Sequence, residues 1–210
     1  MNRAQPLTSE NYTGTAEVWA RAFEDDPAPL AILKGYGVEA RLRALNIAFS
    51  NNLRHCAPPA TPLSIHNEAE LAGAAMIHRP GQFPPPMAAQ LRVFWEGFKA
   101  VRSLSIMWRW AKFLSTLEKH QPKEPHFYLE TLGIDPQWQG LGFGSRLMEQ
   151  LNQWADAEGV GVYLETTKPR NVPFYERHGF HVTKELDVIG VHVWLMWRAP
   201  NQQSNNSGEN

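Results

Sequence analysis

The chain has 210 residues, of which 43% are hydrophobic and 20% are charged, an ordinary composition for a globular protein. Its formal net charge is −1 and it has no block of Lys and Arg, so neither a nucleic-acid partner nor another highly charged partner is expected. The N-terminal residues lack the apolar core of a signal peptide, and no uncharged apolar run is long enough to cross a membrane. The single cysteine, Cys56, excludes an intramolecular disulfide and a cysteine metal cluster, and fits a reducing cytoplasm.

The first part of the chain predicts two amphipathic helices followed by two strands. The first helix covers residues 8–23, with Thr8 or Ser9 as its N-cap and Pro27 shortly beyond its end. The second covers residues 37–53. Residues 62–66 and 71–78 have the pattern of strands, and the short polar turn NEAE between them predicts an antiparallel pair.

A loop with four prolines, RPGQFPPPM, leads into a long helical stretch over residues 90–117. A break in this stretch is expected near Ser103 and Ser105. The stretch mixes tryptophan with arginine and lysine, as membrane-surface helices do. Its apolar residues recur on one helical face, however, so packing on a sheet is the favoured interpretation, and no membrane partner is predicted.

Strands and helices alternate in the second half. The pattern predicts a strand at 126–134, a helix from Gly144 or Ser145 to about Glu158, a strand at 160–166, a short helix at 171–178, and a hairpin of 182–188 and 191–197. The whole order predicts a single α/β or α+β domain over residues 1–200 with a mixed sheet. Residues 201–210, NQQSNNSGEN, are expected to form a disordered polar tail.

A glycine-rich loop, QGLGFGS at 139–145, connects the first of these strands to the following helix. Bare backbone N–H groups at a helix N-terminus attract anions, and glycine lets an anion approach without a Cβ in its way. The loop is neither the phosphate loop G-x-x-x-x-G-K-[ST] nor the dinucleotide fingerprint G-x-G-x-x-G. From these residues alone, a tight turn without a ligand is an equal alternative.

Two motifs resemble a known family. Q-G-L-G-F-G at 139–144 matches the [RQ]-x-x-G-x-[GA] signature of the GNAT superfamily of N-acetyltransferases, and NVPFYERHGF at 171–180 resembles the second landmark of that family. The runs EPHFYLETLGIDPQWQGLGFGS and GVYLETTKPRNVPFYERHGFHVTKE are also similar to the puromycin N-acetyltransferases and their relatives. The resemblance covers residues 126–198 well and the first half only in element order. It implies a mostly antiparallel sheet, flanked by helices and splayed at a cofactor cleft.

The resemblance also implies acetyl-CoA as the acyl donor. Loop residues would hold its pyrophosphate, mainly through backbone amides: Gln139, Gly140, Gly142, Gly144 and Ser145. The strand before the loop would pair its backbone with the pantetheine arm through Leu132, Gly133 and Ile134. Gly140 has simple turn geometry as its alternative role. Asn171 is included among the cofactor contacts, although capping the short helix is its favoured role.

Two catalytic roles are implied as well. Tyr175 matches the tyrosine that commonly acts as general acid and protonates the leaving thiolate; its alternative is a buried aromatic beside Phe174. Glu130, on the strand before the loop, is the first candidate for the general base, and Glu165 is the second. Either carboxylate has a structural alternative, such as an ion pair with Arg170.

The sequence therefore predicts an acetyl-CoA-dependent N-acetyltransferase that acts on a small-molecule primary amine by direct attack in a ternary complex. The alternative is a non-catalytic acyl-CoA-binding module, a sensor or an assembly partner. The scattered histidines show no metal-ligand spacing, so no metal is expected. The acidic run Glu24 to Asp26 is either a solvated helix end or an attractor for a cationic amine. The protein is expected to be a monomer or a homodimer.

Overall fold

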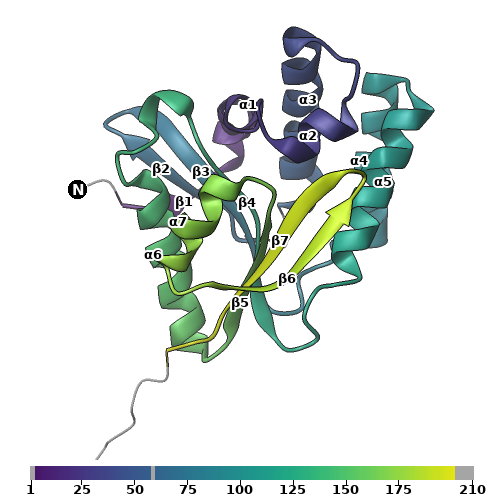
Figure 1. Cartoon of the computed structure of the whole chain (residues 1–210). Coiled ribbons are helices and arrows are strands. Elements are labelled where there is room, and N and C mark those ends of the chain that lie inside the picture. The colour runs from purple at the N-terminus through teal and green to yellow at the C-terminus, as the bar shows by residue number, and fades with distance from the viewer. Residues whose placement is uncertain (1–2, 58–59, 202–210) are drawn as a thin grey trace, which may run out of the picture.

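The computed structural model describes residues 3–57 and 60–201, through which a seven-stranded sheet runs in the order β1-β2-β3-β4-β5-β7-β6 (Figure 1). The strands are β1 Gln5–Pro6, β2 Leu63–Asn67, β3 Glu70–His78, β4 His126–Ile134, β5 Gly161–Thr166, β6 His181–Val188 and β7 Val191–Arg198. The helices are α1 Tyr12–Ala22, α2 Pro27–Ile32, α3 Val38–Cys56, α4 Met87–Val101, α5 Leu104–Glu118, α6 Phe143–Glu158 and α7 Val172–Glu176. The predicted mixed, mostly antiparallel sheet flanked by helices is confirmed.

The sheet opens between its two central strands. Among the described strands, β4 and β5 form the only parallel pair, and their pairing runs from His126 with Gly161 to Leu129 with Leu164. Both strands continue further, β4 to Ile134 and β5 to Thr166, without pairing to each other. The sheet is therefore splayed from Glu130 and Glu165 onward.

A β-bulge lies in β4 at the point where the strands separate. The register of β4 against β3 shifts there, because Ile77 pairs with Leu129 whereas Met76 pairs with Thr131, which leaves Glu130 as the extra residue. As a result Leu129 and Leu132 both pack in the core under α6, although strict alternation would put them on opposite faces. Strict alternation along β4 therefore predicts the wrong face of the sheet for Leu132.

Apolar side chains fill both faces of the sheet. One cluster lies between the strands and α6 and α7, with Met148 and Leu151 of α6 fully buried in it. A second cluster lies on the opposite face, where Trp19 of α1 and Leu53 of α3 pack on Met76. A third joins α2 and α5 to the β6–β7 hairpin, and Figure 1 shows the helices α4 and α5 at that end of the sheet.

The first predicted helix starts later than expected, and a further helix follows it. Residues Ser9–Asn11 form a 3-10 turn and Asn11 is the N-cap of α1, so the prediction of Thr8 or Ser9 as the cap is wrong. Pro27, expected only to discourage continuation of the first helix, is the first residue of α2. Proline suits that position because its missing N–H has no partner in a first turn. Asp26 caps α2, since its carboxylate accepts a hydrogen bond from the N–H of Ala28 at 3.0 Å.

The long helical stretch is broken at the predicted place. Arg102 has a left-handed backbone with φ of 47°, and the Ser103 side chain caps α5. The expected packing on the sheet is wrong for α4, which packs chiefly against α3 and leaves Phe94 and Trp95 exposed. Within the described residues, no helix combines the length and the apolar character needed to cross a membrane. The predicted disordered tail lies outside the described residues, apart from Asn201, whose N–H bonds Asp156 at 2.8 Å.

Candidate active site

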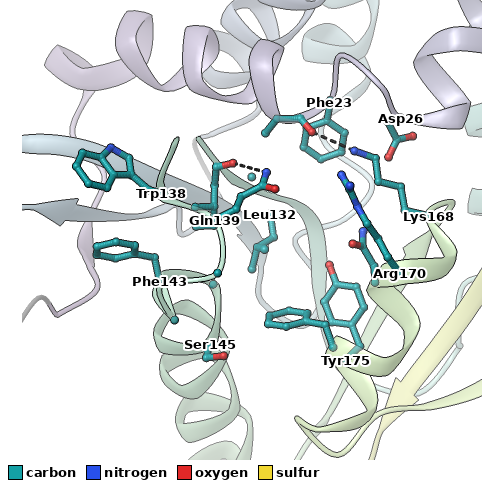
Figure 2. Close-up of a pocket in the computed structure, with 18 of the residues that line it drawn as sticks. Phe23, Asp26, Leu132, Trp138, Gln139, Phe143, Ser145, Lys168, Arg170 and Tyr175 are labelled. Atoms are coloured by element: carbon teal, nitrogen blue, oxygen red, sulfur yellow. Dashed lines mark hydrogen bonds between the residues drawn. The ribbon is translucent and has the colours of Figure 1, made fainter. Parts of the chain in front are cut away.

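A cavity of about 310 Å³ opens beside the splayed end of β4 (Figure 2). It is bordered by the glycine loop, the first turn of α6, the segment from β5 into α7, and the end of α1. It contains every residue assigned to the cofactor from the sequence, together with Tyr175. Glu130 and Glu165 are not among its lining residues. The lining comprises Ala22, Phe23, Asp26, Leu132, Gly133, Ile134, Trp138, Gln139, Gly140, Gly142, Phe143, Gly144, Ser145, Lys168, Arg170, Asn171, Phe174, Tyr175 and Arg177.

The glycine loop has a backbone that only glycine adopts without strain. Gly140 and Gly142 have φ of 79° and 81°, and a Cβ at either position would meet no atom within 4 Å. Gly142 is the N-cap of α6, which begins at Phe143, one residue before Gly144, the earlier of the two predicted starts. The Gln139 side chain folds the loop back onto β4, because its Nε2 atom donates to the Ile134 carbonyl at 3.0 Å. The loop therefore leaves an open cradle at the N-terminus of a 16-residue helix.

The first turn of α6 packs closely against α7. A Cβ at Gly144 would lie 3.4 Å from Cζ of Phe174, so the bare backbone permits close packing of these two elements. The hydroxyl of Ser145 lies 3.1 Å from Nε2 of His178. Burial lowers the pKa of His178 from its ordinary value. The cradle and the short helix that carries Tyr175 thus form one rigid corner of the cavity.

The opposite corner holds basic side chains. Lys168 is buried, and its Nζ atom donates to the carbonyl of Ala22 at 3.2 Å (Figure 2). The same Nζ atom pairs with Asp25. Arg170 reaches the same carboxylate at 3.3 Å. The hydrogen bond from Lys168 holds the pKa of Asp25 below its usual range. Asp25 therefore ties the end of α1 to the loop after β5, while its side chain stays 64% exposed, as expected for a solvated helix end.

Asp26 is a buried carboxyl group at the base of this corner. Burial raises its pKa, while the Thr167 hydroxyl, which donates to it at 2.7 Å, acts in the opposite direction. Its partners are thus a hydroxyl and the first turn of α2. This carboxyl group joins α2 to the loop after β5 and gives the cavity a fixed wall.

Tyr175 lies on α7 with its ring buried at 6% exposure and its hydroxyl directed into the cavity (Figure 2). Burial raises the pKa of its phenol, and the charge of Asp26 raises it further. A phenol with a raised pKa stays protonated at neutral pH. Tyr175 is therefore available as a proton donor to a group bound in the cavity.

Asn171 does not take its favoured role as a helix cap. Its backbone occupies the N-cap position of α7, but its side chain makes no capping hydrogen bond. Instead its Nδ2 atom donates to the hydroxyl of Thr166 at 3.1 Å. The side chain therefore connects the loop to the last residue of β5, where it borders the cavity.

The end of β4 presents a backbone edge to the cavity. Residues from Leu132 to Ile134 pair with β3 on one side, and β5 has already diverged on the other side. Gly133 allows Trp19 to pack directly on this segment, since a Cβ there would lie 2.5 Å from the indole. The indole nitrogen of Trp19 donates to the Ala74 carbonyl at 3.0 Å. Trp19 of α1 thus packs against the end of β4, whose unpaired backbone edge faces the cavity.

Both base candidates lie where β4 and β5 separate, in a cluster with side chains that sequence reasoning missed. Glu130 lies 2.5 Å from Nε2 of His78 and accepts a hydrogen bond from Asn52 at 2.8 Å. Burial raises the pKa of Glu165 to about 7, and the charge of Glu130 contributes to the rise. The sequence contained one signal of this cluster: the tetrapeptide YLET occurs at both 128–131 and 163–166, on strands that pair in register.

The fold and the cradle define the class of protein. The chain matches the model of the acetyltransferase (GNAT) family over residues 34–180, and it belongs to that family. An uncharacterized N-acetyltransferase of Schizosaccharomyces pombe is 32% identical over 82 residues, which are 37% of this chain. The match spans 33% of the length of that curated relative.

Several solved structures share the fold. A histone acetyltransferase HPA2 and related acetyltransferase from Corynebacterium glutamicum aligns with a TM-score of 0.71 and 21% identity over 97% of this chain and 98% of its own. The Drosophila melanogaster polyamine N-acetyltransferase aligns with a TM-score of 0.66 and 17% identity over 95% and 100%. An agmatine N-acetyltransferase aligns with a TM-score of 0.63 and 15% identity over 94% and 99%. These likenesses establish the acetyltransferase fold over nearly the whole chain.

Proposed function

We propose that this protein is an acetyl-CoA-dependent N-acetyltransferase that acetylates a small-molecule primary amine by direct attack in a ternary complex. The observation that carries the proposal is the open cradle of Gly140 and Gly142 at the N-terminus of α6. It lies in the same cavity as the free edge of β4 and the buried Tyr175. Membership of the acetyltransferase family supports acetyl-CoA as the acyl donor.

The cavity fits a pyrophosphate. The loop amides and the α6 N-terminus provide partial positive charge, and a Cβ at Gly140 or Gly142 would occupy the space that an oxygen needs. Lys168, Arg170 and Arg177 also line the cavity, against the single carboxyl group of Asp26. Since Lys168 and Arg170 pair with Asp25, the positive charge that favours an anion comes chiefly from the loop amides and the N-terminus of α6. In this proposal the backbones of Gln139, Gly144 and Ser145 complete the cradle, and Asn171 contacts the donor near the end of β5.

The remaining residues of the cavity suit a thioester. The open backbone edge of Leu132 to Ile134 can pair with the amides of a pantetheine arm, as an added strand would. An N–H of the same edge can polarise the thioester carbonyl. Tyr175 then protonates the departing thiolate, because its phenol is directed into the cavity and holds its proton at neutral pH. Glu130 and Glu165, at the splay, are the candidate bases for the amine.

A small amine is the acceptor class that we propose, with support from two of the solved structures. Two proteins that share the fold are a polyamine N-acetyltransferase and an agmatine N-acetyltransferase. Two carboxyl groups at the splay also suit a cationic substrate. The similarity of residues 124–145 and 161–185 to the puromycin N-acetyltransferases adds puromycin to the amines worth testing.

The test is release of free thiol from acetyl-CoA with spermidine, agmatine and puromycin in turn, with calorimetric titration of acetyl-CoA in parallel. Amine-dependent release together with saturable binding supports the proposal. Thiol release with puromycin alone would indicate that the substrate, as well as the sequence, resembles that of the puromycin N-acetyltransferases. Release with spermidine or agmatine alone would rule out puromycin as the substrate. Binding without release from any of these amines points to the binding module, and the absence of both overturns the proposal.

A further inference from the structure

Most of the large apolar side chains that stay exposed belong to two helices. Among the described residues there are eleven such side chains, and seven of them lie on α4 and α5: Met87, Leu91, Phe94, Trp95, Leu104, Trp108 and Leu114. We call these seven side chains the α4–α5 face. Monomeric proteins rarely concentrate exposed apolar groups in this way, and a large apolar patch marks a surface that another body covers.

The two helices lie against each other at one end of the sheet (Figure 1). Only Arg102 and Ser103 separate them in the chain, and Arg102 turns the chain with a left-handed φ of 47°. Cε of Met107 on α5 lies 4.0 Å from the place that a Cβ of Gly97 on α4 would occupy, so the helices pack together there. The exposed side chains of both helices therefore belong to one part of the surface.

Within each helix, exposed apolar side chains follow a row. On α4, Met87, Leu91 and Trp95 are spaced four residues apart, so they lie on the same side of the helix. On α5, Leu104 and Trp108 have the same spacing and are 77% and 65% exposed. The other sides pack inward, α4 chiefly on α3, and α5 in the cluster with α2 and the β6–β7 hairpin. The rows are therefore not the part of either helix that holds the fold together.

Positive charge accompanies the apolar rows. Residues 87–118 hold five basic and two acidic side chains, a formal charge of +3 in a chain whose net charge is −1. Glu96, one of the two acidic residues, pairs with His55 of α3 at 3.2 Å. Four of the basic side chains are exposed, and no carboxylate of the described residues forms an ion pair with them: Arg92, Lys99, Arg102 and Lys112. The α4–α5 face thus combines apolar side chains with positive charge that no carboxylate neutralises.

This charge argues against a second copy of the chain as the partner. A two-fold dimer places the same patch of both subunits against each other. The basic side chains beside one α4–α5 face would then meet those beside the other. Like charges repel, and the repulsion grows as the interface excludes water. The partner is therefore expected to be negatively charged.

An anionic lipid surface matches both properties of the face. Its negative headgroups attract basic side chains, each of which contributes roughly fivefold in affinity when it lies near the surface. Helices with Trp, Phe and Leu on one side and Lys and Arg beside them lie in the plane of the membrane–water interface. On α4 the two features are in contact, since Nζ of Lys99 lies 5.5 Å from the ring centroid of Trp95. An apolar anchor and a positive charge would thus reach the lipid together.

We infer that α4 and α5 bind the surface of a membrane that contains anionic lipids. The rows that end in Trp95 and Trp108 enter the headgroup region, and the exposed basic side chains contact the lipid anions. The inference goes beyond the proposed function and does not depend on it. It replaces the expectation of no membrane partner, which assumed that these helices pack on the sheet. The cavity is bordered by α6 and α7, which lie away from α4 and α5 (Figure 1).

Co-sedimentation with lipid vesicles tests the inference without requiring turnover. The full chain is mixed with vesicles of phosphatidylcholine alone, or of equal parts of phosphatidylcholine and phosphatidylserine. We expect binding to the phosphatidylserine vesicles to be at least roughly tenfold tighter, because four exposed basic side chains contribute. Added salt should weaken it, because salt screens exposed charges. No binding to the phosphatidylserine vesicles overturns the inference, and so does equal binding to both kinds.

Substitutions show whether the α4–α5 face makes the contact. Trp95→Ser and Trp108→Ser are each expected to weaken binding by roughly fivefold or more, because they remove apolar area that enters the interface. Arg92→Glu should weaken binding to phosphatidylserine vesicles by a similar factor and leave the weak binding to phosphatidylcholine unchanged. Leu141→Ser is the matched control, because Leu141 is 57% exposed but lies on the glycine loop. Equal affinities of Leu141→Ser and all three face variants overturn the inference.

Two further measurements keep the result unambiguous. Circular dichroism shows whether each variant is folded, and if a tryptophan variant is not, the surface change Arg92→Glu still decides. Light scattering during size-exclusion chromatography gives the oligomeric state. An unchanged state in the tryptophan variants supports the inference. A wild-type dimer that becomes a monomer in Trp95→Ser or Trp108→Ser assigns the face to a second copy of the chain and overturns it.

Discussion

The indole of Trp19 on α1 packs directly on the backbone of Gly133 on β4. A Cβ at Gly133 would lie 2.5 Å from Cδ1 of Trp19, well inside van der Waals contact. The same indole is fully buried and bonds the carbonyl of Ala74 on β3, so it cannot easily withdraw. Trp19 therefore fixes the strand whose opposite edge forms the wall of the cavity.

This contact predicts the effect of Gly133→Ala. The added methyl group displaces the indole, and we expect a loss of about 1–3 kcal/mol in the free energy of unfolding, as for other overpacked cores. Gly97→Ala is the matched control, because Gly97 lies inside α4 with no atom closer than 4.0 Å to the added carbon. Alanine there is expected to stabilise by roughly 0.5–1 kcal/mol. Urea denaturation measures the free energy of unfolding of both variants. Equal changes in the two would show that the contact with Trp19 does not account for the effect of Gly133→Ala.

The glycine cradle can be tested with two glycines of α6. Gly142 and Gly159 cap its two ends with φ of 81° and 66°, and neither has an atom within 4 Å of an added Cβ. Alanine at either position is expected to cost roughly 1–2 kcal/mol of stability, because a left-handed backbone is strained for an L-residue. Only Gly142→Ala is expected to weaken acetyl-CoA binding, by tenfold or more, since its methyl group points into open space of the cavity. Calorimetric titration measures the affinity of both variants for acetyl-CoA. Equal affinities would show that the glycine loop does not bind acetyl-CoA.

Tyr175→Phe tests the general acid. The change removes one hydroxyl from a buried ring, so we expect acetyl-CoA affinity to stay within about twofold while kcat falls roughly 10²-fold or more. The alkaline limb of the rate profile should also change, because the phenol no longer supplies the proton. Tyr12→Phe, at the start of α1 and away from the cavity, is the control and should leave kcat unchanged. Normal turnover in Tyr175→Phe would show that the thiolate takes its proton from another group.

The junction of α6 and β7 gives a pH-dependent prediction. Both oxygens of Asp156 accept hydrogen bonds from the buried Arg198 at 2.8 Å, and this pairing lowers the pKa of Asp156. A carboxyl group with a depressed folded-state pKa stabilises the fold above its unfolded pKa of about 3.9 and stops doing so as pH falls through its folded value. Asp156→Asn is therefore expected to cost about 2–3 kcal/mol at pH 7 and less below pH ~4.

Urea denaturation at pH 7 and at pH 3 checks this expectation. Asp187→Asn is the control, because the Asp187 side chain is 79% exposed and its change should stay within about 0.5 kcal/mol. A cost for Asp156→Asn that does not depend on pH would mean that packing, rather than the charge of Asp156, accounts for the effect.

Local chemistry explains why the glycine loop was predictable. Its glycines, its position between a strand and a helix, and the later Tyr175 all lie in one continuous segment, where short-range patterns are informative. The same patterns predicted the break near Ser103 and the β6–β7 hairpin. They failed at Pro27, which was predicted only to end the first helix but is also the first residue of α2. A proline marks a helix boundary without showing whether a helix ends before it or begins at it. They also failed for α4, because an apolar face does not say which surface covers it.

The sequence by itself determined the alternation of strands and helices, the glycine cradle and the family. It could not determine the faces of β4, because the bulge at Glu130 depends on pairing with β3, about fifty residues earlier in the chain. Nor could it join His78 and Asn52 to Glu130, or Asp25 to Lys168, because residues far apart in sequence meet only when the chain packs. The pKa of Glu165 follows from that packing as well, since burial and a neighbouring charge are properties of the folded state. The elements and the family came from local residue patterns, and the environment of the candidate catalytic groups was decided by the tertiary structure.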